Sequence, residues 1–369
     1  MATFNFVGML RPIKDKDNFK GFTTTNYESG WMTEKLRFNI IAGDNRHLVE
    51  INAGRWSDEN KNIIYTSEKV AGNNKGKPIQ VFWNERKDPE IIDKIVGWRI
   101  FTVDTDTYNH RQELEASGDV AALEVSKNKR RHFLAGTDFC EYANKLINSE
   151  KAKDWKFRVT GNINYTYSAK NDTYYATYEV TKIYRVDDDK EPSSEVTMDF
   201  YFTEGAMDSS DFNEVGKVPV IGYTTFYDNT TKKNWFCPVN LIVRENVDGW
   251  NDIFNEFEDK EVRKIGLVCQ KIDGAQKVNI KLENLSDRVR RNIERGLITE
   301  ADAIREAGGQ MYGDNVRELR IVGFGKGYSE GSVTTIYTVE NLMARPIEKT
   351  LAKPKMEDEE NIFDEDDDL

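Results

Sequence analysis

The sequence predicts a mainly β protein made of tandem Greek-key barrels, with a few short helices and a disordered acidic tail at the C-terminus. Three observations predict this fold class. Apolar and polar residues alternate along about ten segments, helical periodicity is confined to three segments, and carboxylates crowd the last residues. Alternation gives a strand one apolar face, and many short strands between Gly, Asn and Asp turns are typical of small barrels.

Each expected element has its own local signal. The strands are the alternating segments FNFVGML, LRFNII, HLVEINA, PIQVFW, WRIFTVD, KFRVTGNI, YYATYEVTKIYRV, VTMDFYF, NWFCPVNLIV and VTTIYTV. The first expected helix is GTDFCEYANKLINSE, which begins at Gly136 and has apolar residues at i, i+3 and i+4. The other two are WNDIFNEFED and LSDRVRRNIERGLITEADAIREAGG, the latter broken near Gly296.

Glycines inside three strands indicate strands that bend. Gly8, Gly161 and Gly323 each end the pattern apolar, polar, apolar, any residue, Gly, at intervals of about one domain length. The first strand of an OB-fold barrel needs such a bend, because it belongs to both halves of the barrel. The OB-fold has five strands. The central part of the chain offers five candidates in a row, at 155–167, 173–186, 195–203, 217–228 and 232–244.

The sequence therefore predicts OB-fold-like units in tandem. The expected division is an N-terminal OB-like β domain at 1–135, a central OB-fold with a leading helix at 136–248, a C-terminal β domain with a helical insert at 249–345, and a linker with the acidic tail at 346–369. Pro346 and Pro354 mark the linker.

The charge distribution is compatible with a nucleic-acid partner. The formal net charge is −12, but residues 357–369 carry nine carboxylates and no Lys or Arg, so the rest of the chain carries −3. A near-neutral body can still hold a basic groove, because local charge attracts phosphates. No segment approaches the ~20 apolar residues of a membrane span, and MATFNFVGML has no signal-peptide pattern. Three separated cysteines predict a cytoplasmic protein without a bound metal or other cofactor.

Aromatic and basic residues are interleaved in every unit, most densely in the tyrosine-rich hairpin at 157–188. Exposed rings can stack on the bases of a single strand, and cations along the same groove can bind its phosphates. For any single tyrosine, a half-buried sheet position is the favoured interpretation, so the functional interpretation concerns the cluster. The candidate nucleic-acid-binding residues are Trp31, Arg37, Trp56, Trp83, Lys127, Lys129, Arg130, Arg131, Arg158, Tyr165, Tyr167, Tyr175, Tyr178, Lys182, Lys232, Lys233, Trp235, Phe324, Lys326 and Tyr328. For Lys127 to Arg131, a solvated connector remains an equal alternative.

The acidic tail adds apolar residues to its carboxylates, as a docking peptide for a basic-rimmed pocket would. In this tail and in the hairpin, the chain resembles the OB-fold single-stranded-DNA-binding proteins of bacteria and bacteriophages, and the phage replication type above all. The resemblance implies sequence-tolerant binding and protection of single-stranded DNA, without catalysis. It also implies recruitment of replication or recombination proteins through Ile362, Phe363, Asp366, Asp367, Asp368 and Leu369. Bacterial tails end in Pro-Phe and this one ends in Asp-Leu, which favours a phage-encoded partner in the host cytoplasm; self-association stays open.

Two other classes of function remain as alternatives. The segment VDTDTYNHRQELE could place Asp104, Asp106, His110, Glu113 and Glu115 around a metal ion in a nuclease site, although a solvated loop is the favoured interpretation. A structural or interaction protein, such as a virion component or an inhibitor of host defences, also fits a mainly β, acidic chain.

Overall fold

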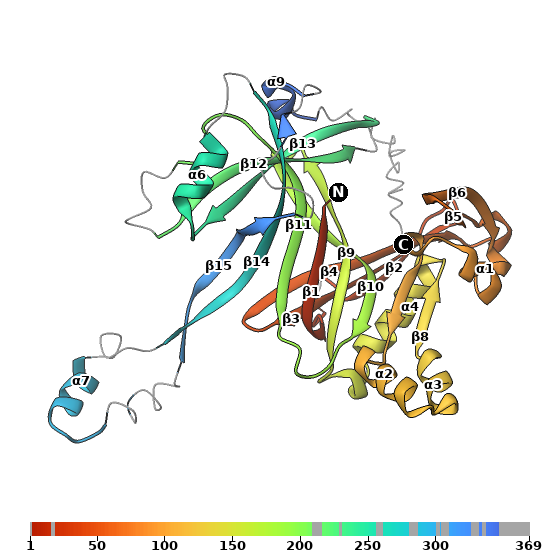
Figure 1. Cartoon of the computed structure of the whole chain (residues 1–369), viewed down its shortest axis with the longest axis horizontal. Helices are drawn as coiled ribbons and strands as arrows, with labels where there is room; N and C mark the ends of the chain where they lie inside the picture. The colour runs from red at the N-terminus through yellow and green to blue at the C-terminus, as the bar shows by residue number, and fades with distance from the viewer. Residues whose placement is uncertain are drawn as a thin grey trace, which may run out of the picture.

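Strands dominate the computed structural model, and this confirms the predicted fold class (Figure 1). The structure describes residues 2–15, 19–208, 216–228, 231–255, 261–279, 287–299, 303, 310–325, 332–333 and 337–346. None of the helices in these ranges is long and apolar enough to cross a membrane.

The first barrel is closed by five strands, each of which pairs with two neighbours. In chain order they are β1 (Thr3–Pro12), β3 (Trp31–Ala42), β4 (Asn45–Trp56), β9 (Lys156–Ser168) and β10 (Thr173–Arg185). Around the barrel the order is β1, β3, β4, β10, β9 and back to β1, with only the β4–β10 pair parallel. The helix α4 (Gly136–Ile147) lies between the third and fourth strands in the chain and packs on β3 and β4. This is the five-stranded Greek-key barrel of an OB-fold.

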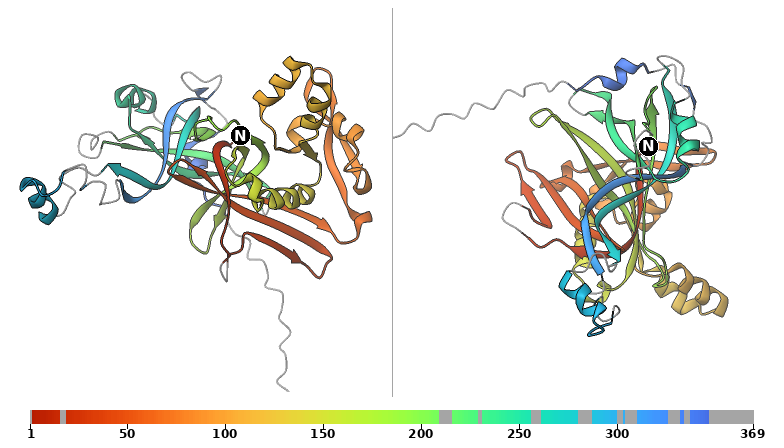
Figure 2. Two further views of the ribbon diagram at one scale, coloured as in Figure 1. Left: turned by 90° about the horizontal axis from the view of Figure 1, so that it is seen from below. Right: turned by 90° about the vertical axis from the view of Figure 1, so that its left-hand side faces the viewer.

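The second barrel repeats this connectivity. Its strands are β11 (Ser193–Phe202), β12 (Val218–Asp228), β13 (Lys233–Val243), β14 (Arg263–Asn279) and β15 (Gln310–Phe324), with α6 (Val247–Asn255) between the third and fourth. Around the barrel β11 pairs with β12 and β14, β12 with β13, and β13 with β15 in parallel, while β14 pairs with β15. The short β16 (Ser332–Val333) pairs with β14, and α9 (Val339–Met343) packs on β13. The helix α7 (Asp287–Glu294) lies beyond the far end of the long β14–β15 hairpin (Figures 1 and 2).

The strand pairing divides the chain differently from the expected domains. The five consecutive strands expected at 155–244 all form, but β9 and β10 complete the first barrel while β11, β12 and β13 begin the second. Alternation identifies a strand but not its partner, so the parallel β4–β10 contact between distant segments was not predictable.

Of the three repeated glycines, only Gly8 lies in the first strand of a barrel. At Gly8 one edge of β1 changes partner, from β11 on the side of Val7 to β3 on the side of Met9. A Cβ at this position would collide with the backbone of Ile41, which is why a glycine is needed there. Gly161 lies in the fourth strand of the first barrel and Gly323 in the fifth strand of the second.

A large insertion between β4 and α4 flanks the first barrel. A separate two-stranded ribbon, β5 (Ile63–Val70) with β6 (Asn73–Phe82), lies between η1 (Glu59–Lys61) and η2 (Trp83–Glu85). There follow α1 (Pro89–Lys94), η3 (Gly97–Arg99), β7 (Phe101–Asp104), α2 (Tyr108–Ser117), α3 (Val120–Lys127) and β8 (Arg130–Phe133). β7 pairs with β10 and β8 with β7, which extends the sheet of the barrel. The remaining elements are β2 (Phe22–Asn26), paired with β3, and η4 (Glu150–Ala152).

The helices α2 and α3 were not predicted from the sequence. Along α2 the only buried residue is Arg111, so the helix shows no apolar stripe. The signals lie at its ends instead. Thr107 accepts a hydrogen bond from the backbone N–H of His110, and the left-handed Gly118 ends the helix. The side chain of Asp119 caps α3 in the same way, by accepting a hydrogen bond from the backbone N–H of Ala122.

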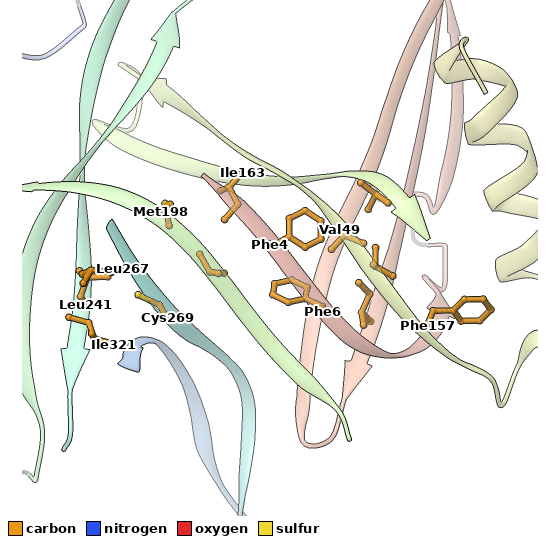
Figure 3. Close-up of a cluster of buried hydrophobic side chains, with 14 of the residues drawn as sticks. Phe4, Phe6, Val49, Phe157, Ile163, Met198, Leu241, Leu267, Cys269 and Ile321 are labelled. Atoms are coloured by element: carbon orange, nitrogen blue, oxygen red, sulfur yellow. The ribbon is translucent and has the colours of Figure 1, made fainter. Parts of the chain in front are cut away.

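One continuous apolar core runs through both barrels. Figure 3 shows residues of this core from both barrels, with Phe4, Phe6 and Phe157 of the first and Met198 and Leu267 of the second. His47 of β4 is fully buried at this junction, with its ring stacked 4.3 Å from that of Phe6 and Nε2 2.6 Å from Ser194 Oγ. Burial, and then the charge of Lys271, lower the pKa of His47 to about 3. His47 is therefore a neutral core residue at neutral pH.

Candidate nucleic-acid interface

The outer face of β3 and β4 presents cations beside the core of the first barrel. Leu36 and Phe38 point into the core, so the alternating side chains of Lys35 and Arg37 point outward. Both face Glu50 of β4, with Nζ–Oε1 and Nε–Oε2 distances of 3.4 and 3.5 Å. We call this surface, with Asn52 beside it, the β3–β4 face. In the OB-fold, the face formed by the second and third strands is the one that binds oligonucleotides.

Two tryptophans meet at one end of the β3–β4 face. Trp31 and Trp56 are directly paired across the two strands, and their rings lie edge to face with centroids 5.2 Å apart. Gly54 makes room for this arrangement, because a Cβ on Gly54 would collide with the ring of Trp31. Lys61 holds its Nζ 5.9 Å from the centroid of Trp56, within reach of a cation–π contact.

The β5–β6 ribbon turns this end of the face into a hollow of about 440 Å³. Tyr65 on β5 lines this hollow together with Trp31 and Trp56, and it is 70% exposed. Trp83 also lines the hollow but is buried, with the guanidinium of Arg86 4.1 Å above its ring. We call this site, lined by Trp31, Trp56, Lys61 and Tyr65, the tryptophan hollow. Stacking rings beside a cation are what a nucleobase and its phosphate require.

Further cations lie beyond Arg37. The guanidinium of Arg37 lies 5.0 Å from the ring centroid of Phe19. Phe19 in turn lines a wider hollow of about 970 Å³, with Lys14 and Arg46 among its other residues. The β3–β4 face therefore has exposed rings and cations at both ends.

The hairpin tyrosines are mostly packing residues. Tyr165 and Tyr178 pack on the core, with Tyr165 Oη 3.6 Å from Met198 Sδ and the ring of Tyr178 5.5 Å from that of Phe4. Burial raises the pKa of both phenols. Tyr167 donates a hydrogen bond to Asp172 at 2.7 Å. Tyr175 points outward and is 49% exposed. Gly161 leaves Phe157, Val159, Ile163 and Tyr165 on one face, so the bend expected there does not reverse the alternation.

Other predicted cations are distributed over separate surfaces. Arg130, Arg158 and Lys182 lie on adjacent strands at the opposite end of β10 from the tyrosine hairpin. Lys127 and Arg131 are exposed, and Lys129 forms an ion pair with Asp106 at 3.2 Å.

The predicted residues of the second barrel do not join the β3–β4 face. Lys232 lies in the β12–β13 turn with a φ of 57°, next to the exposed Lys233. Trp235 donates its Nε1–H to Thr231 Oγ1 at 2.8 Å, and Phe324 packs 5.0 Å from Trp250. Eight of the predicted positions, together with the rest of the tail, fall outside the described residues: Lys326, Tyr328, Ile362, Phe363, Leu369 and Asp366 to Asp368.

Sequence reasoning missed two side chains of this interface. Lys61 and Tyr65 lie in the insertion, where nothing local indicates which ring they will face. Lys35 belongs to the same mixture of rings and cations in the N-terminal unit as Arg37.

The carboxylates of the nuclease alternative are held by cations. Asp104 accepts hydrogen bonds from Arg111 at 2.6 Å and from Arg130 at 2.8 Å. Asp106 accepts from Ser126 at 2.6 Å and from Lys129 at 3.2 Å. Burial raises the pKa of these carboxyls, but the hydrogen bonds outweigh it, and that of Asp106 falls to about 2. Among the described residues no group of His, Cys, Asp and Glu could hold a metal ion. The geometry therefore favours a structural role for both aspartates.

No family model and no curated protein matches the chain. Among solved structures, the wild-type single-stranded DNA binding protein from Thermus aquaticus aligns with 74% of this chain and 85% of its own, at 7% identity and a TM-score of 0.31. A deletion mutant of that protein aligns with 74% of this chain and 87% of its own, at 8% identity and a TM-score of 0.31. At these values the similarity carries no argument, so function has to be argued from the geometry of this chain.

Proposed function

We propose that this protein binds single-stranded DNA, with little sequence preference, through the β3–β4 face and the tryptophan hollow. The observation that supports the proposal most directly is the convergence of Trp31, Trp56, Tyr65 and Lys61 on one hollow at the end of the face. Every base has a π-face, so rings that stack on bases bind without reading sequence. The chain acts by binding and protecting the strand, without chemistry of its own.

Phosphate groups of the DNA would replace the carboxylate of Glu50 as the ion-pair partner of Lys35 and Arg37. Both cations are partly exposed and share one carboxylate, so their charge is only partly compensated. Binding a phosphodiester there releases counterions from the DNA, which makes affinity fall as salt rises.

The acidic tail would serve a second partner. With its carboxylates and apolar residues, this terminus suits docking to a basic-rimmed pocket of a replication or recombination protein, in keeping with a phage-encoded member of such a system.

Tryptophan fluorescence tests the proposal. Oligo-dT should quench the emission of the seven tryptophans, and the midpoint should shift to higher DNA concentration as salt is raised. Labelled oligo-dT followed by anisotropy then gives affinities for variants. Trp56→Ala should cost ~1–3 kcal/mol of binding free energy, and Lys35→Ala should reduce the salt slope by about one.

Trp98→Ala is the matched control, because Trp98 is also exposed but lies on η3, with its Nε1–H bonded to Asn74 O at 3.2 Å. An equal loss in Trp98→Ala and Trp56→Ala would place the binding surface elsewhere. Absence of any response to oligo-dT at low salt would favour a structural or interaction protein.

A further inference from the structure

Four neighbouring strands of the first barrel and its insertion place their side chains in register. Arg158 of β9 pairs with Tyr184 of β10, Tyr184 with Asp104 of β7, and Asp104 with Arg130 of β8. Directly paired residues share a face of the sheet, and neighbouring strands lie ~4.8 Å apart. Two arginines from distant parts of the chain thus lie in one row on either side of a tyrosine.

The next row on this face adds a third cation. This row lies two residues further along each strand. In it, Lys182 of β10 pairs with Thr160 of β9 and with Thr102 of β7, and Thr102 pairs with His132 of β8. His132 Nδ1 lies 3.1 Å from Thr102 Oγ1, and burial, then the charge of Arg130, lower the pKa of His132. Its imidazole is therefore neutral at neutral pH, and Lys182 carries the positive charge of this row.

The carboxylate in the first row is already compensated. Asp104 is 2% exposed and accepts hydrogen bonds from Arg111 on both oxygens and from Arg130 Nε on Oδ2, so its charge is compensated by two arginines. Arg158, by contrast, is exposed, and its side chain makes no hydrogen bond or ion pair with the described residues. The row presents more positive than negative charge to solvent.

The row borders a hollow of about 720 Å³. Arg185 lines it with a guanidinium stacked 4.0 Å above the ring of Trp155, and its buried Nε–H has no acceptor among the described residues. Asp187, Asp189 and Lys190 line the same hollow, so its lining carries charges of both signs.

We infer that this surface, which we call the four-strand face (Arg130, Arg158, Lys182 and Tyr184), is a second contact for the same nucleic-acid strand. Tyr184 stacks on a base, and Arg158 and Arg130 bind phosphates on either side of it. The inference rests on the proposed function and extends it, because it states how a long strand continues around the barrel after leaving the β3–β4 face.

Two carboxylates separate the four-strand face from the β3–β4 face. Glu179 of β10 pairs with Glu50 of β4, at the point where β10 passes from β4 to β7. Burial, and then the charge of Glu50, raise the pKa of Glu179. This pair of carboxylates lies between the cations of the two faces, so a short oligonucleotide occupies one face and only a longer strand spans both.

Oligonucleotide length therefore tests the inference. A single OB-fold covers about 4–16 nucleotides, so dT of roughly 6 residues reports one face and dT of roughly 30 residues can reach both. The double variant Arg158→Ala/Tyr184→Ala should lose roughly tenfold or more in affinity for the long oligonucleotide, with a smaller salt slope. Quenching of tryptophan emission by the short oligonucleotide should stay unchanged. When Tyr184→Phe replaces Tyr184→Ala in the double variant, the stacking part of the lost affinity should return, because phenylalanine keeps the ring.

Arg131→Ala is the matched control, since Arg131 is the exposed neighbour of Arg130 on the opposite face of β8. Equal long-strand affinity in the double variant and the wild type would overturn the inference while leaving the β3–β4 face intact. If dTMP or inorganic phosphate lowers the long-strand affinity of the wild type to that of the double variant and no further, this would support a phosphate contact at the four-strand face. Binding of dTMP there without any contribution to long-strand affinity would overturn it. If the wild type fails to bind the long oligonucleotide, the proposed function itself is wrong.

Discussion

Single residues decide which rings of this protein are available for stacking. Tyr165 and Tyr175 both lie in the tyrosine-rich hairpin, but Tyr165 packs on the core while Tyr175 is half exposed. Gly54 affects a ring in another way, because its missing side chain leaves the space that the ring of Trp31 fills. The rings that form the tryptophan hollow therefore depend on a residue that carries no ring.

Gly54→Ala should weaken DNA binding without unfolding the barrel. The backbone at Gly54 does not have a positive φ, so alanine introduces no backbone strain. The three atoms nearest to the new Cβ all belong to the ring of Trp31, which has to rotate away from Trp56. We expect a loss of affinity close to that of Trp56→Ala, ~1–3 kcal/mol, with the midpoint of urea unfolding nearly unchanged. Wild-type affinity in this variant would show that the position of Trp31 does not matter.

At the scale of elements, buried carboxylates hold neighbouring strands together by accepting hydrogen bonds from cations on more than one of them. Glu318 of β15 accepts hydrogen bonds from Arg320 at 2.8 Å, from Lys217 before β12 at 3.1 Å, and from Arg244 after β13 at 3.1 Å. Its side chain is 6% exposed, so the three cations replace water around it. The same arrangement holds Asp104 and Asp106 in the insertion.

These carboxylates should make stability depend on acid pH. Burial raises the pKa of Glu318, but the hydrogen bonds from Arg320, Lys217 and Arg244 outweigh it and leave the pKa at about 2. A pKa lowered by folding means that the ionised form stabilises the protein above its ordinary pKa, and that this contribution is lost as pH falls toward about 2. Glu318→Gln should therefore be less stable than the wild type at pH ~7, and the gap should narrow below pH ~4.5.

Urea unfolding at several pH values measures this gap, and Glu195→Gln is a suitable control because Glu195 is exposed. A gap that stays constant from neutral to acid pH would contradict the assigned role of Glu318.

At the scale of the whole molecule, the two barrels are joined and not merely consecutive. β1 pairs with β11 from Thr3 to Val7, and the core is continuous across this pair (Figure 3). The backbone N–H of Asp273 in β14 donates to Asn45 of β4 at 3.0 Å, next to the junction that contains His47. The second barrel is therefore joined to the first by strand pairing and a shared core, and not only by the connecting segment.

At this scale we expect the acidic tail to act through its charge. Deleting residues 357–369 removes nine carboxylates, which should leave affinity for oligo-dT equal or higher, because a polyanion competes with DNA for basic surfaces. A full-length variant with those carboxylates changed to amides is the control for chain length. Weaker DNA binding after deletion, measured by anisotropy at low salt, would contradict this role.

The sequence by itself determined the elements and the faces of the strands. Alternation located nine of the ten barrel strands in whole or in part, because a strand points successive side chains to opposite faces. The interleaving of rings and cations selected Arg37, Trp31 and Trp56, although it could not show which of them meet. It failed for α2, whose signals lie in its caps and not in its periodicity.

Only the tertiary structure decided which strands pair, and with them the candidate sites. Trp31 meets Trp56 through the register of β3 with β4, and Arg130 joins Tyr184 and Arg158 through β7, which pairs with the distant β10. A bulge between Val180 and Lys182 sets which side chains of β10 face outward beyond it. Local periodicity carries no information about a distant partner, and a shift of one residue in register would turn every side chain to the other face.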